Sequence, residues 1–150
     1  MTKDLRVERL TEYSPGDAAD LGSLLTALSG RFTGEPVPES LLREIIESPY
    51  HDELVARLEG RIVGAATLSI IMGAGAGKKG YLEDFVVDKS IRRGGIGTRI
   101  WQEMMLWCEE RGVDLEFTSR PERQDAHEFY ASRGAKIRPT SVFRVQLMDE

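Results

Sequence analysis

The sequence contains little cysteine and histidine, and it has no long apolar run. The one cysteine, Cys108, cannot form a disulfide within the chain, and its neighbours Leu106 and Trp107 predict a buried structural thiol. With two histidines and one cysteine, no set of ligands has the spacing of a zinc site, so we predict no metal. Apolar runs fall short of the ~20 residues that a membrane helix needs, and no signal-peptide stretch opens the chain. We therefore expect a cytoplasmic protein without a membrane partner.

The number and distribution of charged residues limit the classes of partner that we expect. The formal net charge is −5, and both signs are spread along the chain. A nucleic-acid-binding domain concentrates basic residues on one surface, so we expect no nucleic-acid partner. The length of 150 residues, with 41% hydrophobic positions, predicts a single domain over residues 1–150.

Apolar periodicity predicts a mixture of strands and helices, with no repeat and no linker. Period-two alternation indicates strands, and a spacing of three to four residues indicates helices. A tight turn at Gly60 and a glycine-rich loop at 73–80 join the central strands. We expect strands at 5–10, 54–58, 62–72, 81–88, 115–118 and 142–147, and helices at 18–28, 41–46, 95–111 and 122–133.

The main chemical signal lies between an apolar strand and an amphipathic helix, in the stretch Arg92-Arg93-Gly94-Gly95-Ile96-Gly97-Thr98. A helix N-terminus carries unpaired N–H groups and partial positive charge, so a glycine-rich entry allows a pyrophosphate to approach closely. Arg92 and Arg93 can add charge. A plain strand-to-helix turn also uses glycine, so this segment by itself leaves both interpretations open.

Two motifs in this order resemble the GCN5-related N-acetyltransferases, the GNAT family. The strand 85–88 followed by Arg92-x-x-Gly95-x-Gly97 is similar to the family's coenzyme A signature, R/Q-x-x-G-x-G/A. The stretch 126–135, AHEFYASRGA, is similar to the family element Ala-x-x-Phe/Leu-Tyr followed by Gly-Phe. The resemblance covers about residues 54–147. It departs at Arg123, where Asn is common, and at Ala135, where Phe is usual.

The resemblance implies an α+β fold, with a mixed, mostly antiparallel sheet of six to seven strands flanked by about four helices. It implies an N-acetyltransferase that moves an acetyl group from acetyl-coenzyme A to a primary amine of a small molecule or peptide by direct attack. Backbone groups of the strand would pair with the pantetheine arm, and the N–H groups of 93–98 would hold the pyrophosphate. The coenzyme-binding residues so implied are Phe85, Val86, Val87, Arg92, Arg93, Gly94, Gly95, Ile96, Gly97 and Thr98.

The resemblance also implies catalytic residues. Tyr130 would lie beside the coenzyme sulfur and protonate the departing thiolate. The stretch 80–87, GYLEDFVV, resembles Gly-His-Ile-Glu-Asp-Ile-Ala-Val of glucosamine-6-phosphate N-acetyltransferases, which favours Glu83 as the general base. Adjacent strand residues point to opposite faces, so we expect at most one of Glu83 and Asp84 to enter the cleft. Many members place the glutamate two residues earlier, at Tyr81 here, which leaves a water-relayed or base-free mechanism open.

A second class of function stays open from the sequence. The fold could serve as a coenzyme-A-binding sensor or interaction module without turnover. Edge strands of such a sheet favour pairing across a two-fold axis, which predicts a homodimer. The identity of the acceptor amine is not encoded in either motif. The helices before Tyr50 are expected to border the acceptor pocket.

Overall fold

The structure of the protein is a computed structural model, and it describes residues 4–91 and 95–149. The chain forms two compact units, Met1–Phe117 and Thr118–Glu150. The sheet belongs to the first unit, and the helix α4 (Gln124–Ser132) belongs to the second. Across the described residues, no helix is both long and apolar enough to cross a lipid bilayer.

The sheet has the strand order β1-β2-β3-β4-β5. The first four strands are antiparallel neighbours, and β5 pairs with β4 in parallel. The expected mixed, mostly antiparallel sheet is therefore confirmed. The expected number of six to seven strands is wrong, because the described residues form five. The strands are β1 (Arg6–Arg9), β2 (His51–Leu58), β3 (Arg61–Gly73), β4 (Gly77–Val87) and β5 (Leu115–Glu116).

The strand expected at 142–147 is absent from the structure as described. Its apolar side chains are exposed, with Phe143 at 90% and Val145 at 82% of their full accessible surface. Alternation indicates which face of a strand would be buried, but the strand forms only where a neighbour supplies its ladder of hydrogen bonds. The sequence pattern carries no information about that neighbour.

Two hairpins form the centre of the sheet. Glu59 and Gly60 have φ values of 53° and 82°, and they link the paired residues Leu58 and Arg61. Two consecutive positive φ values are what a two-residue type I′ hairpin turn requires, so the expected tight turn is confirmed. The glycine-rich segment is less of a loop than expected, because Gly73 already pairs with Gly77 and the turn is confined to 74–76.

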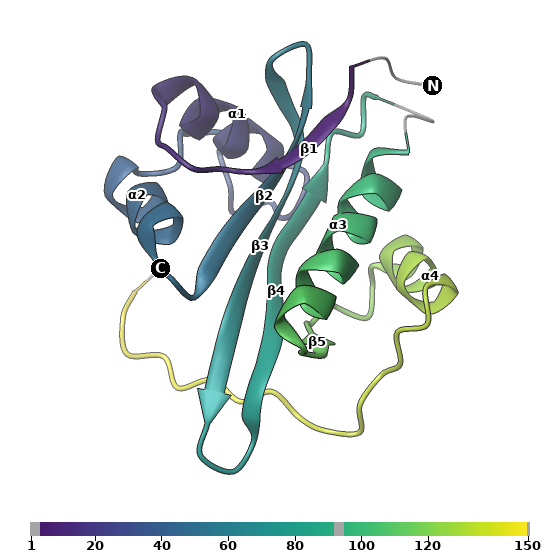
Figure 1. Cartoon of the computed structure of the whole chain (residues 1–150). Coiled ribbons are helices and arrows are strands. Elements are labelled where there is room, and N and C mark those ends of the chain that lie inside the picture. The colour runs from purple at the N-terminus through teal and green to yellow at the C-terminus, as the bar shows by residue number, and fades with distance from the viewer. Residues whose placement is uncertain (1–3, 92–94, 150) are drawn as a thin grey trace. The chain divides into compact units, whose positions relative to one another are not determined.

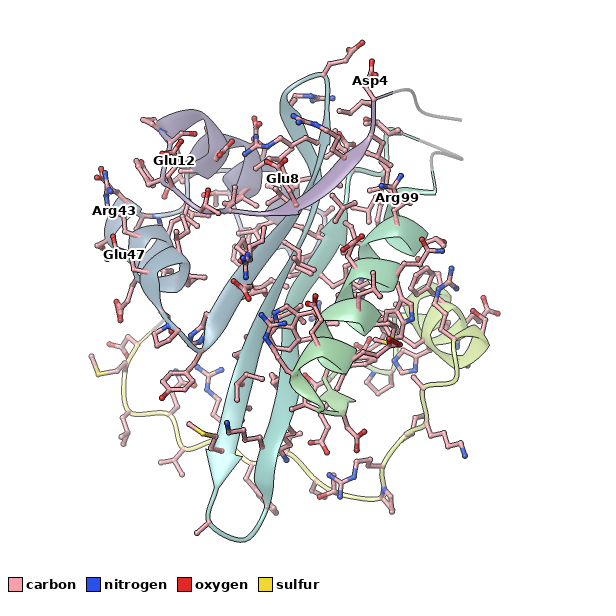
Figure 2. All side chains as sticks on the ribbon, in the orientation of Figure 1. Asp4, Glu8, Glu12, Arg43, Glu47 and Arg99 are labelled. Atoms are coloured by element: carbon pink, nitrogen blue, oxygen red, sulfur yellow. The ribbon has the colours of Figure 1, made fainter. Side chains whose placement is uncertain are left out.

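The helices of the first unit are α1 (Pro15–Leu25), α2 (Glu39–Glu47) and α3 (Ile96–Arg111). α1 begins after Ser14, whose hydroxyl oxygen accepts a hydrogen bond from the N–H of Asp17 at 3.1 Å, as an N-cap residue does. Leu42 of α2 is buried against the sheet, whereas Arg43 and Glu47 lie on the side of the helix that faces away from it (Figure 2). Each helix therefore turns one apolar face inward.

The three helices of the first unit cover both faces of the sheet (Figure 1). A Cβ atom on Gly64 of β3 would lie 2.7 Å from a side-chain carbon of Ile100 and 2.9 Å from one of Ile96, so α3 packs directly on this position. The next residue, Ala65, belongs to the apolar core that α1 and α2 share with the sheet. Because successive strand residues face opposite sides, α3 lies on one face and α1 and α2 lie on the other.

Polar contacts fix two of these helices to β2. The guanidinium of Arg57 donates to both carboxylate oxygens of Asp17 in α1 at 2.8 Å, and to Glu8 in β1 at 2.9 Å. On the other face, the indole N–H of Trp107 in α3 donates to Asp52 at 2.8 Å. Charge-assisted bonds of this kind are stronger than neutral ones, so α1 and α3 have defined positions on the sheet.

Candidate functional site

Strand β4 contains a bulge at Asp84. On β3 one residue separates Ala65 from Thr67, whereas on β4 two residues separate their partners Val86 and Glu83. Asp84 is one of these two, and it has a φ of 53° in the left-handed region. Asp tolerates this conformation better than most residues, but it still costs backbone strain, and such strain is commonly stored at functional sites.

The bulge changes which side chains share a face. The side chains of directly paired residues on neighbouring strands point to the same face of the sheet. Glu83 therefore shares a face with Thr67, and Val86 shares a face with Ala65. The expectation that Glu83 and Asp84 point to opposite faces assumed regular alternation, and the bulge interrupts it. In the structure both side chains are exposed to solvent, and of the two only Asp84 lines a pocket.

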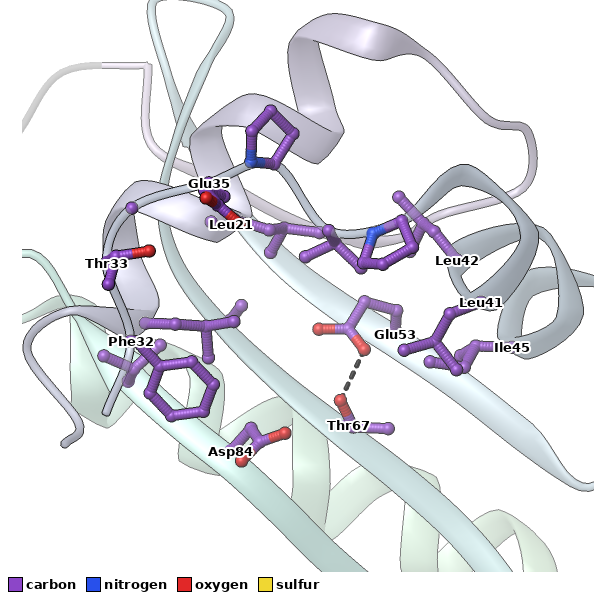
Figure 3. Close-up of a pocket in the computed structure, with 18 of the residues that line it drawn as sticks. Leu21, Phe32, Thr33, Glu35, Leu41, Leu42, Ile45, Glu53, Thr67 and Asp84 are labelled. Carbon is purple, nitrogen blue, oxygen red and sulfur yellow. Dashed lines mark hydrogen bonds between the residues drawn. The ribbon is translucent and has the colours of Figure 1, made fainter. Parts of the chain in front are cut away.

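The pocket lies between the sheet and the two N-terminal helices, where the sequence predicts an acceptor site (Figure 3). It has a volume of about 400 Å³, which is within the range of small-molecule sites. The walls from α1 and α2 are apolar. The polar side chains come from the segment between these helices and from β2, β3 and β4, and they are Arg31, Thr33, Glu35, Glu53, Thr67 and Asp84.

Glu53 is buried, with 5% of its surface accessible. The hydroxyl of Thr67 donates a hydrogen bond to its Oε1 at 2.5 Å (Figure 3). Burial raises the pKa of Glu53 from 4.5 to about 7; the Thr67 hydrogen bond opposes this rise, and the charge of Asp84 adds to it. The carboxyl therefore changes its charge near neutral pH, where a general base is most effective.

Glu53 was not among the site residues predicted from the sequence. The second strand was expected to begin at Leu54, whereas β2 begins at His51. The missed signal was the period of two, because Glu53 occupies the same face as Val55, which is fully buried. A charged residue in the inward register of an apolar strand is rarely accommodated without a partner or a role.

Asp84 is the second carboxylate with weakened acidity. Its side chain is reachable from solvent, but the pocket wall removes part of its hydration and raises its pKa, against a smaller opposing effect of Arg31. Perturbed acids that converge on one pocket are typical of functional sites. Glu53 and Asp84 together give the pocket two proton acceptors.

The start of α3 fits the binding of a phosphate group. Gly95 precedes the helix with a φ of 65°, and its carbonyl accepts the N–H of Arg99 at 2.9 Å. The N–H groups of Ile96 and Gly97 precede this bond in the chain. They belong to the N-terminal end of the helix, which favours anions. Among the described residues beyond its chain neighbours, no heavy atom lies within 4 Å of the place where a Cβ would stand on Gly95, so this part of the structure leaves open space there. The predicted residues Arg92, Arg93 and Gly94 lie outside the described residues.

The predicted pantetheine-binding strand lies at the end of β4, directly after the bulge. Val86 and Val87 pair with β3 on one side. On the other side the described β4–β5 ladder ends at Tyr81 and Glu116, before the segment 85–87 is reached. The described ladder therefore ends before the segment for which the resemblance implies pairing with pantetheine.

Tyr130 belongs to α4, in the second unit. Its ring and that of Phe129 form a T-shaped pair with a centroid distance of 5.9 Å. Burial raises the pKa of Tyr130, with Arg123 opposing the rise and Asp125 adding to it. The phenol is therefore protonated at neutral pH, as a proton donor must be.

Cys108 is buried in α3, at 6% accessibility, and burial raises the pKa of its thiol. Neither property suits a nucleophile, because the thiolate is the reactive form. In the parts of the chain that the structure describes, no three His, Cys, Asp or Glu side chains form a group that could hold a metal ion.

Comparison with known proteins gives the family. Similar solved structures include the aminoglycoside acetyltransferase meta-AAC0020 from an uncultured soil metagenomic sample, with 22% identity, a TM-score of 0.80 and 97% of each chain covered. An acetyltransferase of Trypanosoma brucei has 23% identity and a TM-score of 0.75, over 96% of this chain and 100% of that one. A transcriptional regulator from Bacillus halodurans C-125 has 24% identity and a TM-score of 0.79, over 95% and 99%.

These structures share the fold of this protein. No curated protein matches the chain. The family model described as acetyltransferase (GNAT) family matches residues 22–135, which is more than half of the sequence and includes both motifs. The chain belongs to the GNAT family of acetyltransferases.

Proposed function

We propose that the protein transfers an acetyl group from acetyl-coenzyme A to a primary amine bound in the pocket between α1, α2 and the sheet. One observation carries the proposal. The bulge at Asp84 presents a carboxylate to this pocket, and the same strand then leads to the glycine-rich start of α3. The proposed base and the proposed coenzyme-binding residues thus lie close together in the sequence, on the end of β4 and the start of α3.

The donor would be held by the residues that the resemblance implies. Backbone groups of 85–87 would pair with pantetheine, and the N–H groups of 93–98 would bind the pyrophosphate with help from Arg92 and Arg93. The open space at Gly95 supports this arrangement. Acetyl-coenzyme A supplies an activated thioester, and the protein needs to place the amine against it.

The amine must lose a proton as its nitrogen attacks. The sequence predicts Glu83 for this role, and its pairing with Thr67 gives it the same face as the pocket. The pocket geometry supports the neighbouring Asp84, which lines the pocket and has a raised pKa. We assign the base to Asp84, and Glu83 stays the competing prediction. Tyr130 is the proposed acid, and its protonated phenol would supply the proton that the thiolate takes up.

A thiol-release assay tests the function. The protein is incubated with acetyl-coenzyme A and one amine at a time, and free coenzyme A is titrated. The amines are sisomicin, spermidine, tyramine, glucosamine 6-phosphate and a short peptide. Sisomicin is included because a meta-AAC0020 structure contains it. Amine-dependent release with at least one acceptor is expected.

The sensor alternative gives a different result. A sensor would bind acetyl-coenzyme A in a calorimetric titration and release no thiol with any amine. In that case Tyr130→Phe would also have no effect on either measurement. The homodimer expected from the edge strands stays a prediction.

A further inference from the structure

We infer that Glu53 is a second proton acceptor of the pocket, which takes the first proton from an acceptor amine that enters as a cation. This inference rests on the proposed acetyl transfer. It assigns Glu53 a role in that reaction and assigns the acceptor a charge state on entry.

The reaction breaks two N–H bonds of the acceptor nitrogen. An aliphatic amine is an ammonium ion at neutral pH and carries three N–H bonds, whereas the amide product carries one. The first N–H bond must break to expose the nitrogen lone pair, and the second breaks after the C–N bond has formed. The C–S bond then breaks, and the thiolate takes one proton. One proton is released to water in the balanced reaction.

The pocket contains two carboxyls for these two protons. Asp84 is the proposed acceptor of the second proton, at the bulge of β4. Glu53 lies two strands away on β2 and lines the same pocket. Its Oε1 is held by the hydroxyl of Thr67, and its other oxygen points away from Thr67 (Figure 3). The Thr67 bond therefore orients the carboxyl and leaves an oxygen for the incoming ammonium.

The charges around Glu53 favour a cation. Of the described side chains in the lining, those from α1 and α2 are apolar, so neither helix places a charge beside this carboxyl. β3 contributes the uncharged Thr67, and β4 contributes Asp84. The segment between α1 and α2 contributes Arg31 and Glu35. The lining thus holds three carboxyls against one guanidinium.

An ammonium ion in the pocket would stabilise the charged form of Glu53. A buried carboxylate without a cation is destabilised, and an ammonium in the same pocket restores its charged form. Moving the proton from nitrogen to oxygen then converts the ion pair to two neutral groups, which suits an apolar pocket. Below pH about 7 Glu53 already carries its proton in the free protein and cannot accept another.

The pH dependence of kcat/KM tests the inference, because this ratio reports groups of the free enzyme. The probe is sisomicin, or the amine of the panel that turns over fastest. For the wild type we expect an acidic limb with a midpoint near pH 7. Glu53→Gln should remove this limb and lower kcat/KM at pH 8 by about 10²-fold or more. Glu53→Asp keeps a carboxyl, so its pH profile should still show an acidic limb.

Thr67→Val separates a proton role from a structural one. The Thr67 hydrogen bond lowers the pKa of Glu53, so its loss should move the acidic limb to higher pH. A merely structural role would lower the rate equally at every pH. Glu47→Gln, on the outer side of α2, is the matched control and should leave the profile unchanged.

Two failures are distinguishable. If no amine supports thiol release, the proposed function fails, and the inference about Glu53 falls with it. If thiol is released and the acidic limb is the same in the wild type, Glu53→Gln and Thr67→Val, the acetyl transfer stands and the role of Glu53 is overturned.

Discussion

Replacing Glu53 with Gln should stabilise the folded protein at alkaline pH. The carboxyl is buried, and its pKa of about 7 lies above the ordinary value of 4.5 because burial disfavours the charged form. Gln has nearly the same shape, can still accept the hydrogen bond from Thr67, and carries no charge. The variant therefore removes a charge that the folded state accommodates poorly.

The sign and size follow from proton linkage. Below pH 4.5 the carboxyl is protonated in both the folded and the unfolded chain, so its ionisation costs nothing. Between pH 4.5 and 7 the unfolded chain ionises first, which favours unfolding. Above pH 7 both states are ionised, and the full penalty of about 3 kcal/mol remains. Stability from this group is thus present at low pH and lost as the pH rises through 7.

Urea unfolding at pH 5 and pH 8, followed by tryptophan fluorescence, measures the effect. More than about 2 kcal/mol of the difference between wild type and Glu53→Gln should develop between these two pH values. With a typical urea m-value this moves the midpoint of the variant by about 1 M relative to wild type. Glu47→Gln is the control, because it removes an exposed carboxylate. Equal stability differences at pH 5 and pH 8 would show that Glu53 does not titrate as argued.

Four further outcomes test the remaining assignments. Gly97→Val, in the first turn of α3, should abolish acetyl-coenzyme A binding in calorimetry, and unchanged affinity in a folded variant would remove the phosphate-binding assignment. Tyr130→Phe should lower kcat by about 10²-fold or more with little change in coenzyme affinity, and a small loss would leave the residue structural. Asp84→Asn keeps a residue that tolerates the bulge conformation and should reduce kcat far more than Glu83→Gln, whereas the reverse order would assign the base to Glu83. Gly64→Val should lower the melting temperature, because its side chain would collide with α3, and an unchanged value would contradict that packing.

Most of the elements and the family follow from local features of the chain. The positive-φ turn at Gly60, the apolar spacing of α3 and the glycine that precedes it are local properties, and local properties are visible in a single sequence. The two motifs, taken in their order along the chain, are sufficient to indicate the GNAT family. The same local rules overestimated the sheet, because the alternation at 142–147 could not reveal whether a neighbouring strand was present.

Which carboxylates share the pocket depends on tertiary structure. Strand alternation placed Glu83 and Asp84 on opposite faces, but the bulge depends on how β4 pairs with β3, and that register is a long-range property. Two long-range features identify Glu53 as a site residue: β2 begins early enough to include it, and Thr67 of the neighbouring strand donates a hydrogen bond to it. Its weakened acidity has the same origin. Burial is produced by chain segments far apart in the sequence, so the period of two can indicate that Glu53 faces inward but not that its pKa is raised.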